Sequence, residues 1–417
     1  MKVSSTLGVT PDLPSSARRS FMKAAAGAIG VLGGAAGRFN VAPITPAAAQ
    51  SSTPIDYQVF DLGSVQLQSG IVFPNATLAY KTYGVLAPDK SNVIIYPSYY
   101  SGTHKDMEWL IAADKILDPS RYFVIIVNMF GSGVSSSPSN SVPPIDRGRY
   151  PNVTLTDNVR MQHRLVREVF GVEKIALAFG YSMGAQQAYH WGALFPDMVE
   201  RICVVCGSAR TSPNNFVFLE GIKAALTTDC LWQDNWFAAP PARGLKAFGR
   251  GYAGWGLSPA FYSEGLYKKL GFPTIEDFLV GFWEAYFQQH DANNLLAQLW
   301  SWQNADISAN EMYGGDLVKA LGAIKAKALI MPSETDRYFG VAENAAEVAY
   351  LWKAELRPIP SIWGHLAGNP NGNEPDTAFL EVGDRRGVII GIYHRFGVRK
   401  TPGQHEVEGE DRRAVEA

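Results

Sequence analysis

The chain has 417 residues, of which 47% are hydrophobic, and a formal net charge of −2 at pH 7. This length and apolar content suffice to bury one large core with an insertion, or two smaller cores. The near-zero charge gives no basic field for nucleic acid, so a small molecule is the expected partner, and the sequence leaves a homodimer open.

Residues 1–49 are predicted to be an export signal of the twin-arginine type. Arg18 and Arg19 precede Phe21 and a weakly apolar run of alanine and glycine, and small residues ending at Ala49 provide a cleavage site. The alternative is a basic leader without a role in export. The apolar run is too short for a stable membrane span, and no later run reaches about 18 apolar residues. We therefore expect an exported protein, periplasmic or secreted.

Short apolar runs alternate with helical patterns from about residue 57 onward. Strands are predicted at residues 77–84, 92–98, 122–131, 174–179, 199–205 and 327–332, and helices at residues 108–117 and 156–171. Continuous apolar strands that alternate with helices are typical of an α/β fold with a mostly parallel sheet covered on both faces. The core is expected to comprise residues 50–210 and 326–383.

Residues 211–325 interrupt this alternation with long helical patterns and six of the ten tryptophans. A helical insertion of this kind is expected to form a lid over the sheet, and its inner surface would line any pocket beneath it. Residues 384–417 are rich in glycine and charge, and we expect an irregular, solvated tail there.

The segment "GYSMG", residues 180–184, matches the pattern G-x-S-x-G between a predicted strand and a predicted helix. In that context the serine occupies a sharp turn that exposes its hydroxyl, so Ser182 is the candidate nucleophile. The helix that begins at Met183 directs backbone N–H groups toward the same point. A second N–H is expected from the loop "YPSYYSGTH", where Tyr99 is the candidate, so Tyr99 and Met183 would form an oxyanion hole.

A serine nucleophile needs a histidine base, which follows it in the chain of this architecture. The histidines after Ser182 are His190, His290, His365, His394 and His405. His190 lies on the nucleophile's own helix, His290 in the lid, and the last two in the tail. His365, in the glycine-bordered loop "SIWGHLAGNP", is therefore the candidate base, the alternative being a histidine with a purely structural role.

The acid that orients the histidine is expected at the end of the strand "ALIMPSETD". Asp336 is preferred over Glu334, which lies nearer the strand and has a side chain that would overshoot. The sequence contains no metal-ligand spacing such as H-x-x-x-H, so neither a metal nor another cofactor is expected.

Several segments together resemble the homoserine O-acetyltransferase family of α/β-hydrolases. They include "LAYKTYG", "DPSRYFVIIVNMFGSG", "YPNVTLTDNVRMQHRLV", "GYSMGAQQAYHWGALFPDMVERI" and "WGH". The resemblance implies the α/β-hydrolase fold, with a helical lid inserted after the sixth core strand. It also implies Ser182, Asp336 and His365 as the catalytic residues.

The chain departs from that family around the expected pocket. Tyr181 replaces a glycine before the nucleophile and narrows the mouth, and Leu366 stands where the family has an aspartate. Arg250 matches a lid arginine that holds the substrate's carboxylate in the family. Arg250 and Tyr181 are therefore the candidate substrate-binding residues, although Arg250 fits equally well as a surface residue.

Hydrolysis and acyl transfer share an acyl-serine intermediate, so the three catalytic candidates do not separate them. An exported transferase would lack acetyl-CoA, which is a cytoplasmic metabolite. We therefore predict an exported serine hydrolase that cleaves an ester or an amide. The alternatives are a homoserine-type acyltransferase and a non-catalytic binding protein on the same scaffold.

Overall fold

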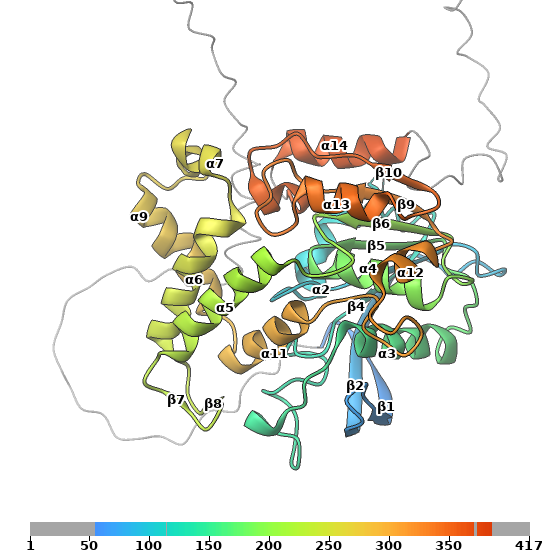
Figure 1. Cartoon of the computed structure of the whole chain (residues 1–417), viewed down its shortest axis with the longest axis horizontal. Helices are drawn as coiled ribbons and strands as arrows, with labels where there is room; N and C mark the ends of the chain where they lie inside the picture. The colour runs from blue at the N-terminus through green and yellow to red at the C-terminus, as the bar shows by residue number, and fades with distance from the viewer. Residues whose placement is uncertain (1–54, 114, 371–372, 386–417) are drawn as a thin grey trace, which may run out of the picture.

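A computed structural model describes residues 55–113, 115–370 and 373–385 (Figure 1). The predicted export signal and nearly all of the predicted tail lie outside the described residues. At the centre is an eight-stranded sheet with the order β1-β2-β4-β3-β5-β6-β9-β10. Its strands are β1 (Gln58–Gln66), β2 (Val72–Tyr83), β3 (Val93–Pro97), β4 (Phe123–Val127), β5 (Leu177–Tyr181), β6 (Arg201–Val205), β9 (Lys327–Met331) and β10 (Ala354–Leu356).

The sheet is parallel from β4 to β10, whereas β2 pairs antiparallel with both β1 and β4. Both faces are buried. In β4, for example, Val124 and Ile126 belong to one hydrophobic cluster, whereas Ile125 and Val127 belong to the cluster on the other face. Strands buried on both sides need continuous apolar runs, which is the pattern seen in the sequence. The α/β fold with a mostly parallel sheet is thus confirmed.

Helices cover both faces of the sheet. The core helices are α3 (Leu155–Glu168), α4 (Met183–Leu194), α12 (Leu317–Gly322), α13 (Val341–Val348) and α14 (Glu374–Arg385). The lid contains α5 (Pro213–Thr227), α6 (Ala242–Gly256), α7 (Pro259–Ser263), α8 (Leu266–Lys269), α9 (Ile275–Phe278), a π-helix (Leu279–Glu284), α10 (Ala285–Phe287), α11 (Ala292–Gln303) and the hairpin β7–β8 (Trp232–Gln233 and Trp236–Phe237). None of the helices in the described residues combines the length and the hydropathy needed to cross a bilayer.

The lid lies between β6 and β9, as the sequence indicated. In Figure 1 its helices α5, α6, α7 and α9 form a group to the left of the sheet. The expected boundary at residue 325 needs correction, because α12 packs on the core. Its residues Ala320 and Leu321 share a hydrophobic cluster with Ala178 of β5 and Ile202 of β6.

The helix predicted at residues 108–117 is wrong. Around this stretch, the residues that the structure describes form only α2 (His104–Met107) and a 3₁₀ turn (Glu108–Leu110), which stops where Ile111 adopts an extended backbone. Ile116 and Leu117 are nevertheless buried in the core. Apolar residues at helical spacing indicate which side chains are buried, and here they are buried by a loop and not by a helix.

A buried acid, Glu347 of α13, holds the loop that leads from β6 into the lid. Its carboxylate accepts hydrogen bonds from the N–H of Ala209 at 2.8 Å and from the amide of Asn344 at 3.2 Å. Burial raises the pKa of Glu347 to about 7. The ordinary pKa of a glutamate is 4.5, so between that pH and about pH 7 the folded protein keeps a proton on Glu347 that the unfolded chain releases.

Because the folded state holds that proton more tightly, the free energy of unfolding is expected to fall as pH rises through this window. The Glu347→Gln variant should lack this contribution, which is on the order of 3 kcal/mol. Urea unfolding at pH 5 and pH 8 measures the loss in both proteins, with Glu264→Gln, an exposed acid, as the control. Equal losses in wild type and Glu347→Gln would contradict this expectation.

Candidate active site

Ser182 lies in the sharp turn between β5 and α4, with a φ of 57°. The two neighbouring glycines are required by close backbone contacts. A Cβ on Gly180 would lie 2.1 Å from the carbonyl oxygen of Gly184, and one on Gly184 would lie 2.6 Å from that of Pro97. A non-glycine residue with positive φ is strained, and such strain is typical of functional turns. The turn presents the hydroxyl at the carboxyl end of the sheet.

The structure brings Ser182, Asp336 and His365 together from three distant segments. His365 lies on a 3₁₀ turn (Gly364–Gly368), and its Nε2 is 2.9 Å from Oγ of Ser182. Its Nδ1 is 2.7 Å from Oδ2 of Asp336. With the proton on Nδ1 donated to the carboxylate, the lone pair of Nε2 faces the serine hydroxyl. This arrangement suits proton transfer from the serine.

The acid and the histidine are held by further hydrogen bonds. The N–H of Tyr338 donates to Oδ1 of Asp336 at 2.8 Å. Thr335, beside the acid, donates its hydroxyl to the carbonyl of Ser361 and accepts the N–H of Gly364 at 3.0 Å, which ties the two loops together. The loop that carries Asp336 and the loop that carries His365 therefore together fix the orientation of the imidazole.

Tyr181 packs directly on the histidine. Its hydroxyl donates to the carbonyl oxygen of His365 at 3.2 Å, and the two ring centroids are 4.8 Å apart. Tyr181 also lines the pocket above Ser182. Tyr181 therefore both supports the His365 imidazole and shapes the pocket above Ser182.

The two candidates for the oxyanion hole both lie near Ser182. Met183 is the first residue of α4, so its N–H has no acceptor within the helix. Tyr99 lies two residues beyond β3, which pairs with β5, and it lines the same pocket as Ser182. Their N–H groups remain the predicted donors.

A pocket of about 950 Å³, counting the space at its open mouth, lies between Ser182 and the lid. Its wall is mostly aromatic, formed by Tyr99, Tyr100, Tyr181, Tyr252, Phe282, Trp283, Tyr286 and Phe287. The polar groups include Ser101, Asp106 and Asn369, and none of the described residues that line the pocket is a lysine or an arginine. The pocket is therefore mostly apolar, with a few polar groups in its wall.

Arg250 does not line this pocket, and the prediction that it binds substrate needs correction. Its guanidinium pairs with the carboxylates of Glu276 and Glu284, and its side chain is 40% exposed. Both acids belong to the lid, and Glu284 is buried. The arginine is therefore a structural cation of the lid.

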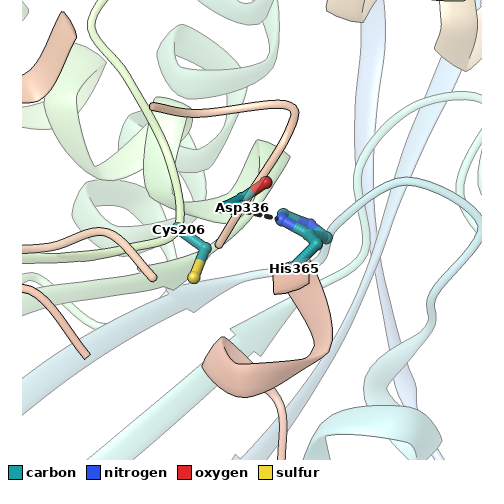
Figure 2. Close-up of side chains that lie close together, drawn as sticks. All are labelled: Cys206, Asp336 and His365. Carbon is teal, nitrogen blue, oxygen red and sulfur yellow. Dashed lines mark hydrogen bonds and ion pairs between the residues drawn. The ribbon is translucent and has the colours of Figure 1, made fainter. Parts of the chain in front are cut away.

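Cys206 is a neighbour of the acid and the histidine that sequence reasoning missed. Figure 2 shows its thiol close to Asp336 and His365, and one potential ligand atom from each lies within 4.8 Å of the others. Burial, assisted by the Asp336 carboxylate, holds the pKa of this thiol well above its ordinary value. Metals bind the thiolate, and Nδ1 of His365 is already engaged with Asp336, so the cluster favours hydrogen bonding over metal binding.

A second group of potential ligands, Asp56, His104 and Glu108, lies outside the pocket. There Nζ of Lys81 lies 2.6 Å from Glu108 and 3.2 Å from Asp56. The ammonium group already supplies the positive charge that a metal would bring, so this group is a salt-bridge network.

The chain is similar to known proteins over most of its length. A family model described as alpha/beta hydrolase fold matches residues 92–367. An ethyl acetate hydrolase from Pseudomonas veronii is 41% identical over 313 residues, which cover 74% of this chain and 89% of that protein. The crystal structure of an acetylester hydrolase from Corynebacterium glutamicum is 36% identical with a TM-score of 0.76, and the match covers 80% of this chain and 95% of that one.

A homoserine O-acetyltransferase from Methanococcoides burtonii is 29% identical over 340 residues, covering 73% of this chain and 68% of that protein. The resemblance noted in the sequence is therefore confirmed, while the esterases are nearer relatives. The chain belongs to the alpha/beta hydrolase fold family.

Proposed function

We propose that this protein is an exported esterase that hydrolyses uncharged, short-chain esters through an acyl-serine intermediate. The observation that carries the proposal is the position of His365, whose two ring nitrogens bridge Ser182 and Asp336 at 2.9 and 2.7 Å. The relatives named for ethyl acetate and acetyl ester hydrolysis support the substrate class.

In the proposed reaction, Nε2 of His365 removes the proton of Ser182 as Oγ attacks the ester carbonyl. Asp336 stabilises the resulting imidazolium, and the N–H groups of Tyr99 and Met183 stabilise the oxyanion. The imidazolium then protonates the leaving alcohol, and the acyl group stays on Oγ. A water molecule, deprotonated by the same nitrogen, then attacks the acyl-serine. As the acyl–Oγ bond breaks, the imidazolium returns the proton to Oγ of Ser182 and the carboxylic acid is released.

The charge of the pocket favours hydrolysis of neutral esters over transfer to an amino acid. A carboxylate-bearing acceptor such as homoserine needs a cationic partner, but none of the described pocket residues is a lysine or an arginine, and Arg250 is held by two glutamates. The Asp106 carboxylate at the pocket would also repel an anionic substrate.

Purified protein assayed on p-nitrophenyl acyl esters of rising chain length tests the proposal. We expect the acetyl ester to be turned over faster than long-chain esters, at a rate that acetyl-CoA and homoserine leave unchanged. Consumption of acetyl-CoA only in the presence of an alcohol acceptor would identify a transferase instead. No turnover of any ester, together with a Ser182 that resists a fluorophosphonate, would indicate a binding protein.

Export is tested separately, in cells. We expect the mature protein outside the cytoplasm, with its N-terminus at Gln50, because the signal is predicted to be cleaved after Ala49. Replacing both Arg18 and Arg19 with lysine should leave the uncleaved chain in the cytoplasm. Cell fractionation with N-terminal sequencing measures both, and an uncleaved wild-type chain in the cytoplasm would contradict export.

A further inference from the structure

A second hollow lies at the end of the lid, away from the catalytic pocket. It holds about 770 Å³, counting its open mouth, between α11, the hairpin β7–β8 and a 3₁₀ turn (Arg147–Arg149). Figure 1 shows the hairpin at the lower end of the lid, close to α11. Of the described residues, none lines both this groove and the pocket at Ser182. We call it the lid groove.

Four aromatic side chains line the lid groove and are only partly buried. They are Tyr150, Trp232, Trp236 and Trp300, which come from three separate segments of the chain. Indole rings combine a large apolar face with one N–H donor. Partly exposed tryptophans gathered in one hollow are a surface on which flat, amphipathic groups can stack.

Amide side chains lie among these rings. Asn152 and Asn235 are exposed at the groove, and each amide offers donors and an acceptor. Asn293, by contrast, is occupied in fixing the hairpin, because it exchanges two hydrogen bonds of 3.0 Å with the backbone of Phe237. The groove thus pairs aromatic faces with polar groups at its rim.

The cations of the groove are paired with acids. Nζ of Lys223 lies 3.0 Å from Glu220, and Nε of Arg147 lies 3.8 Å from Asp146. An anionic ligand would therefore compete with carboxylates that are already in place. The local charge favours a neutral ligand.

The groove is built by close packing of its walls. A Cβ on Gly148 would lie 3.1 Å from the carbonyl oxygen of Asp234, so the turn at residues 147–149 rests on the hairpin. The rings of Trp232 and Phe237 pack within the hairpin at 4.7 Å. A surface held in this way loses little entropy on binding.

We propose that the lid groove binds a neutral carbohydrate chain. The C–H faces of a sugar ring pack on indole faces, and its hydroxyls exchange hydrogen bonds with amides and with indole N–H groups. A purely apolar partner would leave the amides Asn152 and Asn235 unpaired, and an anion would meet paired cations. This site is independent of the proposed ester hydrolysis.

Native gels that contain a soluble neutral polysaccharide test the proposal. The full chain with Ser182→Ala is used, so that acetyl groups on the polysaccharide are not removed during the run. Xylan, galactomannan, hydroxyethyl cellulose and dextran are the probes, and polygalacturonate is the anionic comparison. We expect at least one neutral polymer to retard the protein.

Trp236→Ala and Trp300→Ala should each weaken that binding about three- to tenfold, the scale of one lost aromatic contact. Trp352→Ala removes a tryptophan that is 70% exposed elsewhere and should bind as before. Asn152→Ala tests the amide without altering an aromatic ring, and thermal unfolding checks that each variant is folded. Retardation by no neutral polymer would overturn the proposal, as would stronger retardation by polygalacturonate or equal binding by the tryptophan variants.

Discussion

Replacing Ser182 with alanine is expected to lower kcat for p-nitrophenyl acetate by at least about a thousandfold. The Ser182 hydroxyl lies 2.9 Å from Nε2 of His365, which can remove its proton as it attacks an ester, and alanine has no nucleophile to replace it. The side chain is small and sits in a turn fixed by backbone contacts, so the variant should fold normally.

The matched control is Ser263→Ala, which removes an exposed lid hydroxyl. It should retain wild-type kcat. Steady-state kinetics on freshly purified proteins measures both variants, and turnover by Ser182→Ala within tenfold of wild type would mean that another group is the nucleophile.

The Asp336→Asn variant is expected to lose about a thousandfold or more in kcat, with KM little changed. A neutral amide does not stabilise the imidazolium. If its NH₂ faces Nδ1, His365 must also carry its proton on Nε2, where it can no longer accept the proton of Ser182. Both effects act on the base and leave the pocket wall intact.

Glu334→Gln is the informative control, because Glu334 is the other acid at the end of the same strand. It is exposed in the structure and should have a kcat close to that of wild type. The same kinetic assay compares the two variants. A larger loss of kcat in Glu334→Gln than in Asp336→Asn would show that Asp336 is not the acid that orients His365.

The sheet was predictable because burial on both faces leaves a strong pattern. All six predicted strands are present, as β2, β3, β4, β5, β6 and β9. Ser182 and the histidine could be chosen because a strand, a turn and a helix in sequence restrict where a nucleophile can stand. The hydrogen bond between Asp336 and His365 could not be predicted in the same way. It depends on loops held by contacts, such as those of Thr335, that leave no pattern in the sequence.

The errors have a common physical origin in tertiary contacts. Arg250 matched the position of a lid arginine in the family. In the structure its guanidinium pairs instead with two acids, which lie 26 and 34 residues further along the chain. The helix predicted over residues 108–117 had the correct buried residues and the wrong backbone.

The contact of Cys206 with Asp336 is also a tertiary contact that the sequence did not reveal, although the position of Cys206 in the chain gave one indication of it. Cys206 directly follows β6, and β6 lies next to β9 in the sheet, so the carboxyl ends of the two strands meet. Strand order, which the sequence does not state, was the missing information.

The proposed mechanism requires His365 to remove the proton from Ser182, and covalent labelling with a fluorophosphonate tests this step most directly. Intact mass and peptide mapping should show one adduct per wild-type chain, located on Ser182, and almost none on His365→Ala in the same time. An unreactive wild-type protein, an adduct on another residue, or equally fast labelling of His365→Ala would contradict it.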